Sequence, residues 1–263
     1  MSRYALADSG PLATLHHEVL ALLWDDTTRP LINKAVKLPG AACLDLGSGG
    51  GSVAAWLASE VGNTGLVLAV DRVLQPGFPI RSTLHHEVHE MTARAPLPSK
   101  WMRHTWDLVH ARLALVHMEG RDEIATALAG RLKPGGVLLI TELVPDGRVL
   151  RAPSDEDRDL VHRILVGVAD SFVASGTDRG WSLRAAAVLA DAGLEVSGAR
   201  YGRMWRGGSH GAGFVAGTVL QLQSDLLERE FTPAQIDRAL ELFMDPDFLM
   251  SGHLMSSTWG TKR

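Results

Sequence analysis

Cysteine is almost absent from this sequence: Cys43 is the one cysteine among 263 residues. A single cysteine cannot form a disulfide within the chain, which favours a reducing, cytoplasmic environment. Cys43 lies in an apolar run and is expected to be a small core side chain. Long hydrophobic runs are missing too, since none approaches the ~20 residues of a membrane span. Residues 1–10 lack the pattern of a signal peptide, so we expect a cytoplasmic protein with no membrane partner.

An excess of basic residues is also missing. The chain has 26 Lys and Arg against 30 Asp and Glu, a formal net charge of -4. Nucleic-acid binding favours a basic face, so we expect no nucleic-acid partner. The composition is 46% hydrophobic and 21% charged, which is typical of a folded chain and not of a disordered one. A homo-oligomer is compatible with these properties.

Short apolar runs alternate with helical patterns in the middle of the chain. The apolar runs predict strands at residues 41–46, 66–70, 83–88, 106–110 and 137–142. Helical patterns follow at residues 52–61 and 119–132, and residues 133–136 (Lys-Pro-Gly-Gly) predict a turn. Such alternation predicts a parallel sheet with helices on its faces. One crossover differs, because Pro76, Gly77 and Pro79 argue against a regular helix between residues 71 and 83.

Helical patterns flank this core. One covers residues 12–38, and others cover residues 154–174, 182–192, 211–230 and 232–244, with extended segments at 194–205 and 248–259. We therefore predict three regions: a helical N-terminal segment at residues 1–40, an α/β core at residues 41–145, and residues 146–263, which combine a helical cap with strands that complete the sheet.

The first core strand ends in closely spaced glycines, Gly47, Gly49 and Gly51. Glycine lets the backbone turn sharply and approach a ligand, and the N–H groups of the next helix face that ligand. The spacing resembles a dinucleotide fingerprint, but Ser52 stands where the third glycine is expected. Asp71 ends the second strand, where a carboxylate can accept hydrogen bonds from ribose hydroxyls. These features alone leave NAD and S-adenosylmethionine open, and a tight turn without a ligand remains an alternative.

Four segments resemble motifs of the class I (Rossmann-like) S-adenosylmethionine-dependent methyltransferases. They are residues 43–51 (CLDLGSGGG), 68–72 (LAVDR), 106–112 (WDLVHAR) and 132–140 (LKPGGVLLI). The resemblance covers about residues 41–142. It implies a doubly wound sheet of seven strands, the last one antiparallel, with an N-terminal helical lid and a helical cap inserted after strand five. It also implies S-adenosyl-L-methionine as cofactor and S-adenosyl-L-homocysteine as product.

The resemblance assigns roles to residues of the cofactor site. Asp45 would hold the amino group of the cofactor, and Asp71 its ribose hydroxyls. Glu90 would receive the adenine amino group, with Met91 against the ring. His110 and Ala111 would line the methyl-transfer end. The full predicted set is Tyr4, Asp45, Gly47, Ser48, Gly49, Asp71, Arg72, Glu90, Met91, His110 and Ala111, in which Tyr4 belongs to a segment that folds over the cofactor in similar enzymes.

Residues that act on the acceptor are less marked. A weak nucleophile needs a general base, and His117 and His210 are the candidates because histidine titrates near neutral pH. Glu142 at the end of strand five is expected to bind substrate, and His162 with Arg163 could recognise an anionic acceptor. Structural hydrogen bonds or a solvated helix face are the alternatives for these residues. No metal site is expected, because no carboxylate-rich motif accompanies the histidines near residue 86.

Residues 107–117 resemble small-molecule methyltransferases of bacterial secondary metabolism, which implies a small-molecule acceptor. No Asn-Pro-Pro-Tyr-like motif follows strand four, which argues against methylation of adenine or glutamine. Two alternatives stay open. One is a methyltransferase-like protein that binds the cofactor as a cyclase or regulatory module. The other is a nicotinamide-dependent oxidoreductase, against which the missing third glycine argues. The acceptor, and whether oxygen, nitrogen or carbon is methylated, stay open too.

Overall fold

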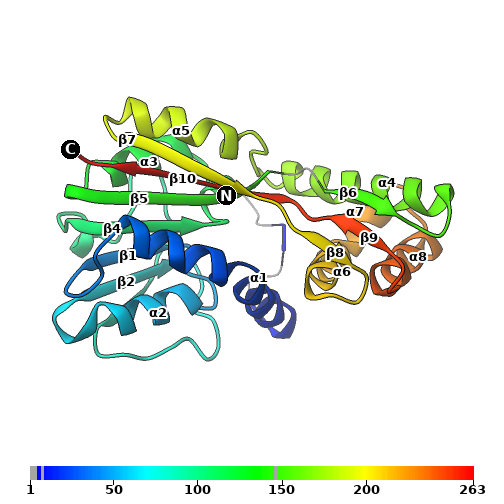
Figure 1. Ribbon diagram of the computed structural model, residues 1–263, viewed down its shortest axis with the longest axis horizontal. Coiled ribbons are helices and arrows are strands. Elements are labelled where there is room, and N and C mark those ends of the chain that lie inside the picture. Colours follow the sequence, from blue (N-terminus) through cyan, green and yellow to red (C-terminus); the bar gives the residue numbers. More distant parts are fainter. Residues whose placement is uncertain (1–4, 7–8, 145–146) are drawn as a thin grey trace. The chain divides into compact units, whose positions relative to one another are not determined.

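The computed structural model describes residues 5–6, 9–144 and 147–263. The chain divides into two compact units (Figure 1). The sheet unit comprises Trp24–Glu142, Gly180–Arg200 and Ser256–Arg263, and the helical unit comprises the chain up to Leu23, Leu143–Arg179 and Tyr201–Met255. Each unit is therefore assembled from three separate stretches of the sequence.

A seven-stranded sheet in the order β3-β2-β1-β4-β5-β10-β7 forms the centre of the sheet unit. Its strands are β1 (Ala42–Leu46), β2 (Leu66–Asp71), β3 (Leu84–Val88), β4 (Trp106–Arg112), β5 (Leu132–Val144), β7 (Glu195–Tyr201) and β10 (Leu254–Thr261). The pairs β1–β2, β1–β4, β2–β3 and β4–β5 are parallel. β10 runs against β5, since Gly135 and Gly136 bond to Lys262 while Thr141 bonds to Ser257. This architecture confirms the predicted Rossmann-like sheet.

Helices cover both faces of this sheet (Figure 1). The sheet unit contains the end of α1 (Pro11–Ala35), α2 (Ser52–Glu60), α3 (Arg121–Ala129) and α5 (Trp181–Asp191), with short 3-10 helices η1 (Gly62–Thr64), η2 (Ser99–Trp101) and η3 (Leu115–His117). Alternate strand residues enter two apolar clusters, one packed with α3 and α5 and the other with α1 and α2. Cys43 belongs to the second cluster, and its burial raises the pKa of its thiol to about 12. Cys43 is therefore a core residue, as expected.

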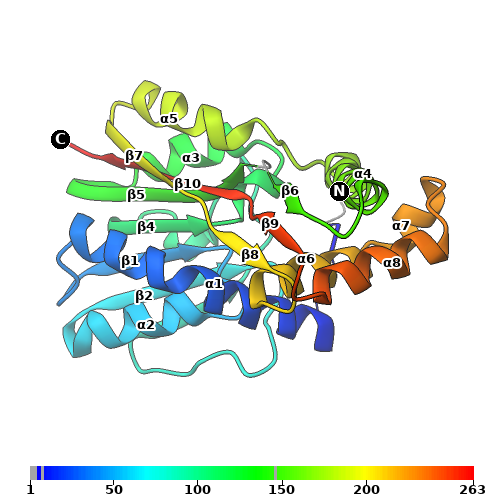
Figure 2. The same ribbon diagram turned by 45° about the vertical axis from the view of Figure 1, so that its right-hand side comes forward.

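The helical unit contains α4 (Asp155–Ala174), α6 (His210–Gln221), α7 (Gln223–Glu228) and α8 (Pro233–Met244) (Figure 2). Side-chain caps fix three of these starts, because Ser154 accepts the N–H of Asp157, Ser209 accepts the N–H of Ala212, and Thr232 forms a capping box with Gln235. The unit also contains an antiparallel sheet that the sequence did not predict, β6 (Arg148–Arg151), β9 (Leu249–Ser251) and β8 (Met204–Arg206). Across the described residues, no helix is both long and apolar enough to span a membrane.

Two segments of the core, the crossover after β2 and residues 133–136, belong to or follow the motifs singled out in the sequence. The crossover after β2 has no helix, as Pro76, Gly77 and Pro79 predict, and it lies against the glycine turn: a Cβ built on Gly51 would be 2.6 Å from the Phe78 ring. The predicted turn at residues 133–136 is wrong in one respect, because these residues form the first part of β5. Backbone hydrogen bonds between Gly135, Gly136 and Lys262 hold them in the sheet.

Candidate functional site

The turn between β1 and α2 depends on glycine. Gly47, Gly49 and Gly51 have φ values of 67°, 51° and 79°, a region that side chains disfavour. The N–H groups of Gly47 and Ser48 both donate to the Val70 carbonyl of β2, at 2.8 and 3.2 Å. A Cβ built on Gly47 would lie 2.4 Å from the Cβ of Ala114, in the segment after β4. The glycine turn is therefore packed between the carboxyl ends of β2 and β4.

Asp71 fixes the same turn from the end of β2. Its Oδ2 accepts the N–H of Gly49 at 2.8 Å, and its Oδ1 accepts the N–H of Arg72 at 2.7 Å. The side chain is half-buried, and a carboxylate can accept further hydrogen bonds beyond these. The N–H of His89 donates to the Asp71 carbonyl at 2.8 Å. This bond brings residues 90 and 91 to the end of β2, with Glu90 exposed and Met91 buried.

Asp45 and His110 form a buried pair beneath the glycine turn. They are register partners in β1 and β4, and His110 Nδ1 lies 2.7 Å from Asp45 Oδ1. Because a carboxylate can only accept, Nδ1 carries the proton. His110 Nε2 is buried and has no hydrogen-bond partner within the described part of the chain. The next residue, Ala111, points to the opposite face of the sheet and is buried in the apolar cluster that packs with α3 and α5.

A second polar cluster joins α1 to the end of β4. Arg112 Nη1 donates to Asp25 Oδ1 at 2.9 Å and to Thr28 Oγ1 at 3.0 Å. Asp25 also pairs with Arg29 at 2.8 Å and accepts the hydroxyl of Ser52 at 3.3 Å. Arg112, Asp25 and Ser52 thus tie α1, β4 and the start of α2 together. The sequence alone does not reveal this cluster, although Arg112 lies in the fourth-strand motif.

Glu142 lies at the end of β5 and contacts the segment after β4. Its Oε1 accepts the N–H of Val116 at 3.1 Å. Burial raises the pKa of Glu142 to about 8, although the backbone N–H groups of residues 114–116 and the charge of Arg121 act to lower it. Its Oε2 has no partner among the described residues.

Two comparisons with known proteins show what this geometry is similar to. Residues 44–140 match the family described as a methyltransferase domain. A candidate methyltransferase from Bacillus halodurans, of known structure, superposes with a TM-score of 0.56 at 16% identity, over 90% of this chain and 100% of that chain. Residues 44–140 thus resemble a methyltransferase domain, and the solved structure shows the same fold. The match begins at Leu44 and ends at Ile140, so it spans the glycine turn, Asp71 and the Asp45–His110 pair.

Other relatives of this methyltransferase domain are distant. Methyltransferase GfsG of Streptomyces halstedii is 30% identical over 137 residues, which are 49% of this chain and 47% of that protein. The chain thus spans about half the length of this curated relative. A cyclopropane-fatty-acyl-phospholipid synthase-like protein from Lactobacillus casei has a TM-score of 0.54 at 16% identity, covering 98% and 96% of the two chains. A candidate methyltransferase from an antibiotic biosynthesis pathway of Anabaena variabilis has a TM-score of 0.56 at 12% identity, covering 89% and 96%.

The remaining predicted residues lie outside or at the margin of the methyltransferase domain's glycine turn. His117 ends η3 and is half-buried. His210 is the first residue of α6, and His162 and Arg163 lie on α4; all three are exposed and belong to the helical unit. Tyr4 lies outside the described residues. Over residues 5–6, 9–144 and 147–263, no group of three or more His, Cys, Asp or Glu is arranged to hold a metal ion.

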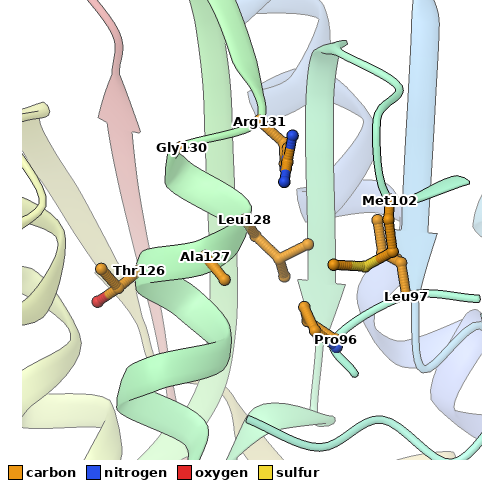
Figure 3. Close-up of a pocket in the computed structure, with 8 residues that line it drawn as sticks. All are labelled: Pro96, Leu97, Met102, Thr126, Ala127, Leu128, Gly130 and Arg131. Atoms are coloured by element: carbon orange, nitrogen blue, oxygen red, sulfur yellow. The ribbon is translucent and has the colours of Figure 1, made fainter. Parts of the chain in front are cut away.

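A separate pocket of about 270 Å³ lies between the end of α3 and the segment before β4 (Figure 3). Its lining includes Leu97, Met102, Leu128 and Arg131. Arg131 directly precedes β5, so the pocket lies toward the amino ends of the parallel strands, away from the glycine turn. None of the predicted site residues lines it.

Proposed function

We propose that this protein transfers a methyl group from S-adenosylmethionine to a small-molecule acceptor. The observation that carries the proposal is the meeting of the glycine turn, Asp71 and the Asp45–His110 pair at the carboxyl ends of β1, β2 and β4. In an open parallel sheet, ligands bind beyond the carboxyl ends of the strands. In this proposal residues 1–40 act as a lid, 41–145 bind the cofactor and 146–263 select the acceptor.

The polar groups at this edge fit an adenosyl amino acid. Asp71 can accept both ribose hydroxyls while its oxygens hold the glycine turn, with Arg72 beside it. The hydroxyl of Ser48 and the Nε2 of His110 are buried without partners among the described residues, and such atoms lose free energy until a donor or acceptor reaches them. We assign Gly47, Gly49 and Asp45 to the methionine end, and Glu90 and Met91 to the adenine.

Methyl transfer requires little from the protein beyond alignment of the acceptor with the methyl group. S-adenosylmethionine supplies a methyl group already activated on a sulfonium, which an acceptor displaces in line. The chain then has to orient the acceptor and exclude water. For a weak nucleophile we propose His117 or His210 as general base, and His162 with Arg163 as contacts for an anionic acceptor. Tyr4 is proposed to cover the cofactor.

A small-molecule acceptor is supported by two features of the sequence. The formal net charge of -4 gives no basis for binding a polyanion, and residues 107–117 resemble small-molecule methyltransferases of bacterial secondary metabolism. We propose that the protein acts in such a pathway, in the cytoplasm.

Calorimetry with S-adenosylhomocysteine and NAD tests the cofactor assignment. We expect S-adenosylhomocysteine to bind, NAD not to bind, and Asp71→Asn to weaken binding at least about tenfold, because charge-assisted hydrogen bonds contribute ~1.5–3 kcal/mol. Asp122→Asn on α3, an exposed carboxylate paired with Arg184, is the matched control and should bind like the unmodified protein. Binding of NAD in place of S-adenosylhomocysteine would contradict the proposal.

Turnover is tested separately with a panel of phenols, amines and carbon acids, by following release of S-adenosylhomocysteine. Release with at least one acceptor is expected. Tight cofactor binding without release on any member of the panel would favour a cyclase or a regulatory binding module.

A further inference from the structure

The carboxyl group of Glu142 contacts the segment that follows β4. Glu142 is 1% exposed, and its Oε1 accepts the backbone N–H of Val116 at 3.1 Å. Val116 lies in the first turn of the short 3-10 helix η3, where backbone N–H groups have no partner inside the helix itself. Glu142 therefore supplies the acceptor that this segment, residues 113–117, cannot supply from within.

The same segment is strained where it leaves the strand. Leu113 has a φ of 54°, a left-handed conformation that residues with a Cβ disfavour. The N–H of Leu113 donates to the carbonyl of Thr141 in β5 at 2.9 Å. Two successive residues of β5, Thr141 through its backbone and Glu142 through its side chain, thus hold residues 113–117 in this conformation.

The position of this segment sets the position of the glycine turn. The methyl group of Ala114 occupies the space where a Cβ of Gly47 would lie, 2.4 Å away, so the two backbones are in close contact. The segment ends at His117, a candidate general base. A displacement of residues 114–116 would move the surface on which Gly47 rests.

We propose that Glu142 is a positioning residue that holds residues 113–117 against the glycine turn, and that it acts on cofactor binding through this segment. The inference rests on the proposed function, because its consequence is tight binding of the adenosyl amino acid. This role differs from the direct substrate contact expected from the sequence, which stays a prediction, and it is favoured because one oxygen of the carboxyl group accepts the N–H of Val116 and the side chain is buried.

Two substitutions separate the acceptor oxygen from the charge. Glu142→Gln keeps a neutral group of the same length with an oxygen that can accept the N–H of Val116. Glu142→Met keeps a similar length and removes the acceptor, which leaves that N–H buried and unpaired. Glu195→Met on β7, an exposed carboxylate paired with Arg263, is the control for the same exchange of residue types.

Hydrogen–deuterium exchange and calorimetry on the full chain test the role. In Glu142→Met, amide exchange over residues 114–116 should accelerate at least about tenfold, and affinity for S-adenosylhomocysteine should fall at least about tenfold. Glu142→Gln and Glu195→Met should stay close to the unmodified protein in both measurements. If Glu142→Met does not fold, Glu142→Asp, whose carboxyl group is one methylene shorter, should show the same two changes to a smaller degree.

Several results would overturn the inference. Unchanged exchange over residues 114–116 in the methionine or aspartate variant would show that the carboxyl group does not hold the segment. Faster exchange with unchanged affinity would separate the segment from the cofactor site. Equal losses in the glutamine and methionine variants would show that the acceptor oxygen is not what matters. If the unmodified protein does not bind S-adenosylhomocysteine, the proposed function fails, while the exchange comparison still decides whether Glu142 holds the segment.

Discussion

Two buried side chains at the carboxyl edge of the sheet each leave one polar atom without a partner among the described residues: His110 through Nε2 and Glu142 through Oε2. A buried polar atom without a hydrogen bond costs ~1–3 kcal/mol. Most protein cores contain few such atoms, and a functional site is one place where they are retained. Under the proposed function, the cofactor bound beside the glycine turn would supply the missing partner of His110 Nε2.

His110 can be tested with two substitutions that keep different halves of the imidazole. Asparagine reaches Asp45 from the position of Nδ1 but leaves the position of Nε2 empty, whereas glutamine reaches outward to the position of Nε2. If the cofactor uses Nε2, His110→Asn should lower affinity for S-adenosylhomocysteine about tenfold, and His110→Gln should lower it less. Calorimetry measures both. His85→Asn, at an exposed position on β3, is the control.

The opposite order, with glutamine weaker than asparagine, would assign His110 to a structural bond with Asp45 alone. Thermal unfolding of the variants distinguishes a loss of folding from a loss of binding.

Glu142 predicts a dependence of stability on pH. Burial raises the pKa of this carboxyl group to about 8 from an ordinary value of 4.5, while the nearby backbone N–H groups of residues 114–116 and the charge of Arg121 act to lower the pKa. Between about pH 4.5 and pH 8 the folded protein therefore holds a proton that the unfolded chain releases, so this group's contribution to stability falls as pH rises through that window. Glu142→Gln removes the dependence. The Tm of Glu142→Gln minus that of the unmodified protein should increase from pH 5 to pH 8.5.

Parallel Tm curves for the two proteins would contradict this assignment. Glu195→Gln, which alters an exposed carboxylate, should run parallel to the unmodified protein throughout.

The turn between β1 and α2 shows how one element depends on a missing side chain. Alanine at Gly47 would add a Cβ 2.4 Å from that of Ala114 at a φ of 67°. Alanine at Gly62 would meet a similar φ of 64° with no atom within 4 Å. Gly62→Ala should therefore cost only the ~1 kcal/mol of a left-handed alanine. Gly47→Ala should also weaken S-adenosylhomocysteine binding at least about tenfold, since a neighbouring backbone must shift. Equal affinities in calorimetry would contradict this reasoning.

Elements defined by local pattern were predictable from the sequence. Apolar runs that end in turn residues gave β1 to β4, and the caps Ser154 and Thr232 marked the starts of α4 and α8. The small sheet of the helical unit was not predictable, because each of its strands has three or four residues and pairs with a segment distant in sequence. Residues 133–136 read as a turn locally, and only pairing with Lys262 makes them part of β5.

The candidate site was likewise predictable only where a local sequence pattern marks it. Gly47, Asp45 and Asp71 belong to short motifs, so their neighbourhood could be predicted. The partners Asp25 and Arg112 are 87 residues apart, and Glu142 and Val116 are 26 residues apart. No local signal links them, because side chains meet across strands and helices only once the sheet has formed. Roles for His117, His210, His162 and Arg163 stay predictions.

At the scale of the whole molecule, cofactor binding should stabilise the unit that holds the glycine turn. A ligand at 100 times its Kd stabilises the state that binds it by about 2.7 kcal/mol, which corresponds to roughly 5–10 °C in Tm for a chain of this size. Scanning calorimetry with S-adenosylhomocysteine measures the shift. Hydrogen–deuterium exchange should show the added protection at residues 47–51, 71–73 and 110–117 of the sheet unit. An unchanged Tm at saturating ligand would contradict the proposed site.

The order of strands also governs how the protein can be made. β7 (Glu195–Tyr201) has β10 (Leu254–Thr261) as its sheet neighbour, and β10 also separates it from β5. On the ribosome, β1 to β5 can pair as soon as they emerge, whereas β7 must wait with unpaired N–H and C=O groups until β10 has been synthesised. Such an edge invites pairing with other nascent chains. The place of β10 in the sheet therefore has two expected consequences. A chaperone should bind the chain during that interval, and the chain should aggregate when translation stalls between the two strands.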